Sequence, residues 1–218
     1  MKRLRGWLVL ALLALAGPVL ASVDAPVAGV DYVEIAGGQP FAPAAGKIEV
    51  AEVFGYVCPH CAHFEPILAE WKRRQPADVQ LTRIPAAFGG YWAPYARAYY
   101  AAEQLGVVDK THKAMFDALH AERTLPIQNV SLDELAAFYA RFGVKREAFE
   151  QAIRGTKVDA QIKRSADFLT RGEIDLTPTL VVAGRYKITG GRTFDDVLKI
   201  ADWLVAQERT RIRGAKKK

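Results

Sequence analysis

The sequence predicts an α/β fold that is interrupted by an inserted all-helical domain. Strand patterns lie towards both ends of the 218-residue chain, at residues 47–57, 78–85 and 177–191, whereas the segment 91–171 has only helical periodicity. We therefore expect one discontinuous α/β domain, formed by residues 22–90 and 172–210, with residues 91–171 as a helical insertion.

The N-terminus has the layout of a cleavable secretory signal peptide, residues 1–21. The basic stretch "MKRLR" precedes ten apolar residues, and the small residues Val19 and Ala21 mark a cleavage site after Ala21. The alternative is a retained membrane anchor, but a helix that spans a bilayer needs about 20 apolar residues. We expect an exported protein, in surroundings where disulfides persist.

The charge of the chain is concentrated at its two ends. The formal net charge of the full chain is +6. Three positive charges lie in the expected signal peptide, and six positive charges lie in the last ten residues. We expect residues 211–218 to form a basic disordered tail, with weak attraction to an anionic membrane as the alternative. The high isoelectric point therefore gives no reason to expect nucleic-acid binding.

The first part of the mature chain predicts the order strand, strand, helix, strand. Residues 31–36 alternate like a short edge strand, and residues 47–57 form a continuous apolar run typical of a strand covered on both faces. Residues 59–74 have helical periodicity, with Pro59 at the first helical position. Residues 78–85 predict a further strand, so we expect a parallel pair of strands.

Five helical segments follow, and Ser131 with Glu134 predicts a capping box at the start of one of them. The chain then returns to the α/β domain with a β-hairpin that turns near Gly184 and Arg185. Residues 193–208 form the closing amphipathic helix, for which Thr193 is the expected cap.

The chain has two cysteines, Cys58 and Cys61, in the motif "CPHC" at the start of helix 59–74. Unpaired backbone N–H groups and the helix dipole favour a thiolate at Cys58, and the thiolate is the attacking species in disulfide exchange. Cys61 lies one turn later on the same face but deeper. We predict a redox couple in which Cys58 is the nucleophile and Cys61 the resolving thiol.

A metal site and a structural disulfide are the alternatives for this motif. A structural zinc site needs four ligands, and the sequence offers no second paired motif. A bridge that closes a four-residue loop removes little entropy from the unfolded chain. Besides the cysteines, the only candidate nitrogen ligands are His60 and three histidines that we expect at the surface: His63, His112 and His120.

His60, between the two cysteines, is expected to tune the couple. A protonated imidazole would favour the thiolate of Cys58, stabilise the reduced form and so make the disulfide a stronger oxidant. The alternative is an exposed residue at the start of a helix without influence on Cys58.

The dithiol motif, Pro66 and the downstream "TPTLVVAG" together resemble the thioredoxin superfamily. The Pro-His dipeptide and the interposed helices resemble the DsbA family of periplasmic thiol:disulfide oxidoreductases. The resemblance implies a thioredoxin-like fold with a helical insertion. It also implies that Pro178 is the cis-proline facing the dithiol and that Thr177 offers backbone groups to an extended substrate; a trans proline at a strand start is the alternative.

The resemblance further implies that Glu52 is the buried acid of the superfamily. Strand parity supports this, because Ile48, Val50, Glu52 and Phe54 share one strand face. Burial should raise the pKa of Glu52 and make it a proton shuttle for Cys61. The alternative is a glutamate exposed at a strand edge.

These features predict a monomeric periplasmic enzyme that donates its Cys58–Cys61 disulfide to unfolded or partly folded exported proteins with free thiols. By resemblance, a quinone-linked membrane oxidase of the DsbB type reoxidises it, without a bound cofactor or metal. The aromatic stretch 86–92 would hold unfolded peptides, unless it packs in the core. Three alternatives stay open: a reductase or isomerase of the same superfamily, a substrate-dedicated oxidase, and a non-catalytic peptide-holding module. By resemblance, an isomerase would carry an added dimerisation domain, for which the N-terminal segment leaves no room.

Overall fold

The computed structural model describes residues 25–215 and contains a five-stranded sheet with the order β1-β5-β4-β2-β3. The inner strand β2 runs parallel to β3 and antiparallel to β4, and the hairpin β4-β5 continues to the edge strand β1. The predicted edge strand, parallel pair and hairpin are confirmed. The strands are β1 (Tyr32–Glu34), β2 (Ile48–Phe54), β3 (Val79–Pro85), β4 (Thr179–Val182) and β5 (Tyr186–Ile188).

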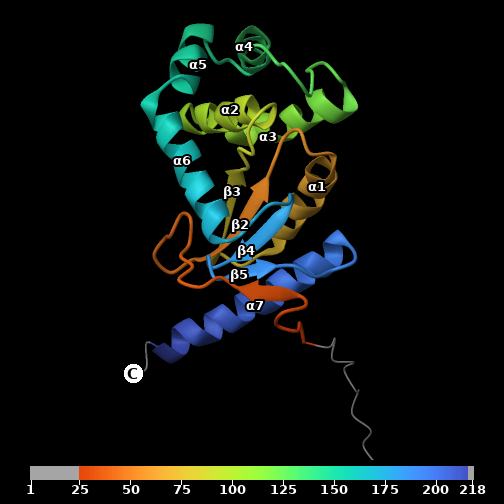
Figure 1. Cartoon of the computed structure of the whole chain (residues 1–218), viewed down its shortest axis with the longest axis vertical. Helices are drawn as coiled ribbons and strands as arrows, with labels where there is room; N and C mark the ends of the chain where they lie inside the picture. Colours follow the sequence, from red (N-terminus) through yellow and green to blue (C-terminus); the bar gives the residue numbers. More distant parts are fainter. Residues whose placement is uncertain (1–24, 216–218) are drawn as a thin grey trace, which may run out of the picture.

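The inserted segment has helices as its regular elements, as predicted, and joins β3 to β4. Figure 1 shows most of its helices stacked beyond one end of the sheet, with α6 running back beside it. The second predicted helix continues into a single π-helical turn, η1. The inserted elements are α2 (Trp92–Gln104), α3 (Val108–Phe116), η1 (Asp117–Ala121), α4 (Leu132–Ala140), α5 (Arg146–Ile153) and α6 (Thr156–Arg171).

Helices cover both faces of the sheet, which explains why every residue of β2 is buried. Ile48 and Val50 pack against α1 (Pro59–Arg74) and α7 (Phe194–Ala215), whereas Ala51 and Val53 point to the opposite face and meet α6. The alternation follows from the two-residue period of a strand. The thioredoxin-like fold with a helical insertion is confirmed, whereas the proposed domain boundaries stay a prediction.

Local hydrogen bonds start two of the helices as predicted. Ser131 and Glu134 form a reciprocal capping box at α4, and Thr193 makes the corresponding exchange with Asp196 at the start of α7. The predicted disordered tail from 211 is wrong in its first part. Helix α7 continues to Ala215, and Arg211 forms an ion pair with the buried carboxylate of Glu208, which stabilises this last part of the helix.

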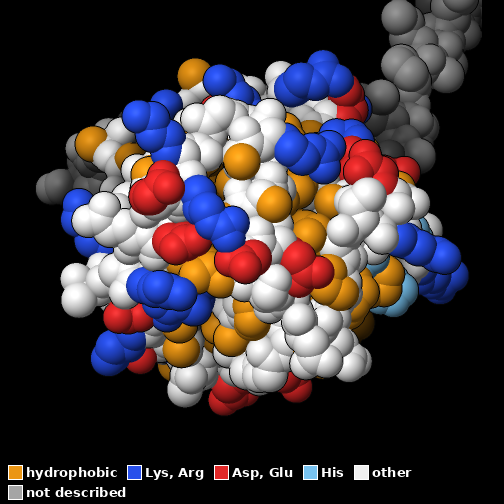
Figure 2. All heavy atoms as spheres, turned by 90° about the horizontal axis from the view of Figure 1, so that it is seen from above, with side chains coloured by type: hydrophobic (Ala, Val, Ile, Leu, Met, Phe, Trp, Pro, Cys, Tyr) orange, Lys and Arg blue, Asp and Glu red, His pale blue; other side chains and the backbone are white. Residues whose placement is uncertain are grey.

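The predicted signal peptide, residues 1–21, lies outside the described residues. Within residues 25–215, the helices are too short or too polar to cross a bilayer. Seen from the end that carries α4 and α5, the surface mixes positive, negative and apolar side chains without a field of one sign (Figure 2).

Candidate active site

Cys58 is the N-cap residue of α1, placed there by a tight turn after β2. Its backbone is extended, with φ −88° and ψ 116°, and Pro59 follows at the first helical position. Cys58 keeps 7% of its surface exposed, whereas Cys61 is fully buried. Both sulfurs are present as free thiols. An incoming sulfur can therefore reach only Cys58, and the roles of nucleophile and resolving thiol stay a prediction.

The two thiols have pKa values shifted in opposite directions. The pKa of Cys58 is lowered to about 5, chiefly because the Cys61 side chain donates a hydrogen bond to its thiolate; the Thr177 side chain and the backbone N–H groups of Cys61 and His60 add to this against the effect of burial. Burial raises the pKa of Cys61 far above the ordinary value of a thiol. At neutral pH the dithiol is therefore one thiolate beside one thiol.

The loop before β4 lies directly against Cys58. The Thr177 carbonyl oxygen is 3.5 Å from the Cys58 Sγ, although the two residues are 119 positions apart. The Thr177–Pro178 peptide bond is cis, as the resemblance implies. The next residue upstream, Leu176, is 71% exposed. This loop thus presents backbone and apolar surface beside the reactive sulfur.

His60 and Pro59 occupy the exposed first turn of α1. The backbone N–H of His60 favours the Cys58 thiolate, in the manner of a residue that follows an N-cap. Within residues 25–215 its imidazole forms no hydrogen bond. The role expected for the His60 side chain stays a prediction.

Glu52 is buried in the middle of β2, with 1% of its surface exposed. It is paired in register with Arg83 of β3, but its Oε2 is 3.7 Å from the Arg83 Nε and both atoms lack a hydrogen bond. Burial raises the pKa of Glu52 to about 8, against a smaller opposing effect of Arg83. Its carboxyl is therefore largely protonated at pH 7, and when it ionises, its charge raises the pKa of Cys61 further.

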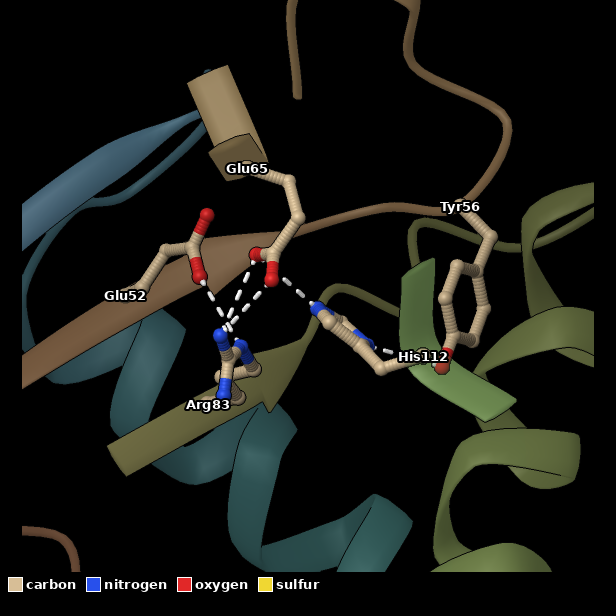
Figure 3. Close-up of polar contacts among 5 residues, drawn as sticks. All are labelled: Glu52, Tyr56, Glu65, Arg83 and His112. Carbon is tan, nitrogen blue, oxygen red and sulfur yellow. Dashed lines mark hydrogen bonds and ion pairs between the residues drawn. The ribbon is translucent and has the colours of Figure 1, made fainter. Parts of the chain in front are cut away.

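A chain of polar contacts continues from Arg83 into the inserted helices (Figure 3). The Arg83 Nη2 donates to both carboxylate oxygens of Glu65, at 2.9 and 3.2 Å. The His112 Nε2 lies 3.2 Å from the Glu65 Oε2, and the His112 Nδ1 lies 2.9 Å from the Tyr56 hydroxyl. The chain therefore joins β2, β3, α1 and α3 behind the dithiol.

Comparison with known proteins decides the family. A protein-family model described as Thioredoxin matches residues 34–202. The thiol:disulfide interchange protein DsbA of Pseudomonas aeruginosa is 34% identical over 210 residues, which cover 94% of this chain and 98% of that protein.

The chain belongs to the DsbA family. DsbA of Azotobacter vinelandii is 36% identical over 184 residues, or 84% of each protein. The crystal structure of the oxidoreductase DsbA from Xylella fastidiosa is 51% identical, with a TM-score of 0.82 over 85% of this chain and 98% of that one. This DsbA-family protein is a thiol:disulfide oxidoreductase, and Cys58 and Cys61 form its Cys-x-x-Cys motif.

Two histidines of this DsbA-family protein were misplaced by sequence reasoning. His63 is exposed as expected, but His112 is 4% exposed and His120 is half-buried, with its Nε2 2.7 Å from the Tyr56 carbonyl oxygen. The expected surface position of His112 and His120 is wrong because α3 and η1 pack onto the loop before Cys58. The His112 ring lies against Phe54, with ring centroids 5.0 Å apart.

Sequence reasoning also missed Arg83 and Glu65. A signal for Arg83 existed, because a basic residue at the centre of a strand predicted to pair with the strand of a buried glutamate is a candidate counter-charge. Glu65 lies four residues after Cys61, one helical turn along the same face. His112 had no comparable signal, since its contact to Glu65 spans 47 residues.

The aromatic stretch before α2 lies close to the reactive loop. The Trp92 ring fills the space beside Gly55, where a Cβ atom would come within 2.1 Å of it. The rings of Phe88 and Tyr91 lie against Trp92, at 5.1 and 6.1 Å between centroids, and both are exposed. These exposed aromatic side chains therefore belong to the surface that surrounds the loop leading to Cys58.

Proposed function

We propose that this DsbA-family protein acts in the periplasm as an oxidase that donates its Cys58–Cys61 disulfide to newly exported proteins. The observation that carries the proposal is the lowered pKa of Cys58, about 5. A stabilised thiolate favours the reduced form. At pH 7, the two pH units between the pKa and the ambient pH correspond to about 3 kcal/mol, or about 60 mV, in favour of donating the disulfide.

The reaction begins when a substrate thiolate attacks the Sγ of Cys58 in the oxidised protein. The Cys58–Cys61 bond breaks, a mixed disulfide forms, and Cys61 leaves as a thiolate that takes up a proton. A second substrate thiolate then attacks the substrate sulfur of the mixed disulfide and releases Cys58 as a thiolate. The substrate gains one disulfide, and the protein gains two electrons.

Glu52 supplies the proton that Cys61 needs in this sequence. Its pKa of about 8 keeps its carboxyl protonated at neutral pH. The raised pKa of Cys61 means that a departing thiolate there binds a proton strongly. Proton transfer from a carboxylic acid that is neutral at the working pH is ordinary general acid catalysis.

The substrate lies along the loop at Thr177 and Pro178, with its apolar side chains on Leu176, Phe88 and Tyr91. Exposed backbone and unselective apolar surface suit unfolded chains of many sequences. A quinone-linked membrane oxidase of the DsbB type then accepts the two electrons at the Cys58 sulfur. The signal peptide, residues 1–21, directs the protein to the periplasm and is cleaved. The mature protein acts as a monomer.

Equilibration of the purified protein with glutathione buffers tests the direction of the reaction. We expect the protein to be mostly reduced at a ratio of glutathione to glutathione disulfide at which an ordinary dithiol is oxidised. A mostly oxidised protein would instead indicate a reductase.

A second experiment separates the oxidase from a peptide-holding module. Cys58→Ser should abolish disulfide formation in exported proteins while peptide binding persists. Continued disulfide formation by this variant would contradict the proposal.

A further inference from the structure

The buried charge cluster behind the dithiol contains two carboxyl groups and one guanidinium group. We use this name for Glu52, Glu65, Arg83, His112 and Tyr56 (Figure 3). Only 1% of the Glu52 side chain and 8% of the Glu65 side chain are exposed. Two ionised carboxylates beside one positive charge would leave an uncompensated charge in a medium of low dielectric constant, so one carboxyl keeps its proton.

The geometry shows which carboxyl is ionised. Arg83 directs its Nη2 at both oxygens of Glu65, whereas its contact with Glu52 is 3.7 Å long and forms no hydrogen bond. Burial acts to raise the pKa of Glu65, but the hydrogen bonds and the electrostatic effects of His112 and Arg83 outweigh it and lower that pKa. Glu65 is therefore the carboxylate and Glu52 the acid.

The contacts of His112 fix which of its nitrogens carries the proton. The Glu65 carboxylate can only accept, so the His112 Nε2 carries the hydrogen and donates it to Glu65. The Nδ1 is then the acceptor, and the Tyr56 hydroxyl, whose pKa burial raises well above its ordinary value, donates to it. Burial lowers the pKa of His112, so the imidazole is neutral and adds no charge to the cluster.

The other titratable groups that face the cluster cannot replace Arg83 as a counter-charge. At the start of α1, Cys58 acts on Glu52 and Cys61 is acted on by it, and Tyr99 of α2 lies against the His112 ring at 6.0 Å between centroids. Tyr139 acts on Tyr56 from α4. Each of these groups is either neutral or negative, so the proton must be divided between Glu52 and Glu65.

We propose that His112 is a positioning residue that assigns the shared proton to Glu52. Its hydrogen bond stabilises the carboxylate of Glu65, which in turn retains Arg83. Glu52 thereby receives no hydrogen bond from Arg83 and holds a proton that it can give to Cys61. This inference rests on the proposed shuttle role of Glu52 and extends the catalytic machinery to the inserted helices.

Carboxyl titration by nuclear magnetic resonance tests the assignment, using the reduced protein labelled with carbon-13 at the glutamate carboxyls. Glu52→Gln and Glu65→Gln identify the two signals. We expect Glu52 to titrate at about pH 8 and Glu65 to complete its titration at low pH. In His112→Leu, Glu65 should lose a hydrogen bond to its ionised form, which raises its midpoint by about one to two pH units.

The coupled pair gives this variant a specific signature. If the proton is shared, both signals should show two steps at common midpoints in His112→Leu, whereas in the unaltered protein each carboxyl shows one dominant step. Two unchanged single-step titrations in His112→Leu would overturn the proposal. If this variant does not fold, His112→Asn serves in its place, because its shorter amide reaches towards Tyr56 but not Glu65.

Two controls separate the hydrogen bond to Glu65 from the packing of the imidazole. Tyr56→Phe removes the other contact of His112 and should leave both titrations unchanged. His112→Gln keeps a donor near the position of Nε2 and should restore the unaltered pattern; failure to restore it would contradict the proposal. These titrations do not depend on the direction of disulfide exchange, so failure in the glutathione experiment would overturn the proposed function and not this assignment.

Discussion

Glu52 and Arg83 are direct neighbours in the register of β2 and β3, yet they form no hydrogen bond with each other. A buried carboxyl beside a guanidinium group would ordinarily ionise and pair with it. Here Arg83 is bound to Glu65 instead, and the pKa of Glu52 rises to about 8. The result is a protonated acid held behind the dithiol at neutral pH.

The thiolate of Cys58 should make the stability of the reduced protein depend on pH. Its pKa is about 5 in the folded state and 9 for an ordinary thiol. Because the folded value is the lower one, the stabilisation is fully present above pH 9 and is lost as the pH falls to 5. As the pH rises from 5 to 9, the free energy of unfolding of the reduced protein should therefore increase relative to that of the oxidised protein. Urea unfolding of both forms measures it; a constant difference would argue against the lowered pKa.

His60→Ser tests whether the imidazole acts on Cys58 at all. If a charged His60 side chain favours the thiolate, the variant should raise the pKa of Cys58 by about one unit and make the couple less oxidising. Thiolate absorbance and glutathione equilibration measure both quantities. An unchanged pKa would leave the backbone N–H groups and the Cys61 side chain as the causes of the shift.

Thr177→Val tests the side chain of the residue before Pro178 with a change that nearly preserves shape. The Thr177 side chain contributes to the lowered pKa of Cys58. Loss of its hydroxyl should raise that pKa by roughly half to one unit and weaken the oxidant. Thr177→Ser retains the hydroxyl and is the matched control. Identical thiolate titrations in the two variants would rule out the contribution of the hydroxyl.

Glu52→Gln tests the proton transfer to Cys61. Glutamine resembles the protonated acid in shape but cannot give up a proton to the departing sulfur. We expect slower formation of mixed disulfides, the step in which Cys61 departs, by about 10²-fold or less, with a smaller change in reduction potential. Stopped-flow kinetics with a thiol peptide measure the rates. Equal rates in both proteins would exclude the shuttle role of Glu52.

The same variant should also change how stability depends on pH in the reduced protein. The folded pKa of Glu52, about 8, lies above its ordinary value of 4.5. Its stabilising contribution is therefore fully present below pH 4.5 and is lost as the pH rises to 8, at a cost of about 3 kcal/mol at pH 7. In Glu52→Gln the free energy of unfolding should fall less between pH 5 and pH 8. Parallel slopes for the two proteins would contradict the raised pKa.

The sequence alone determined the order of the elements and the identity of the reacting atoms. Strand and helix periods are local, and Cys58, Pro59 and Cys61 lie within one turn of each other, so both could be predicted from the spacing of side chains. The parity of β2 also placed Glu52 on an inward face. The contact of the Thr177–Pro178 loop came from the resemblance to the family, because it joins positions 119 residues apart.

Only the tertiary structure decided the protonation of the site. The pKa of a buried group depends on the solvent it loses and on the charges that face it, and these come from elements distant in the sequence. The packing of α3 against α1 and β2 brings His112 to Glu65, which takes Arg83 from Glu52. A sequence pattern cannot predict this competition, because its outcome depends on differences of less than one ångström between contacts of side chains from four different elements.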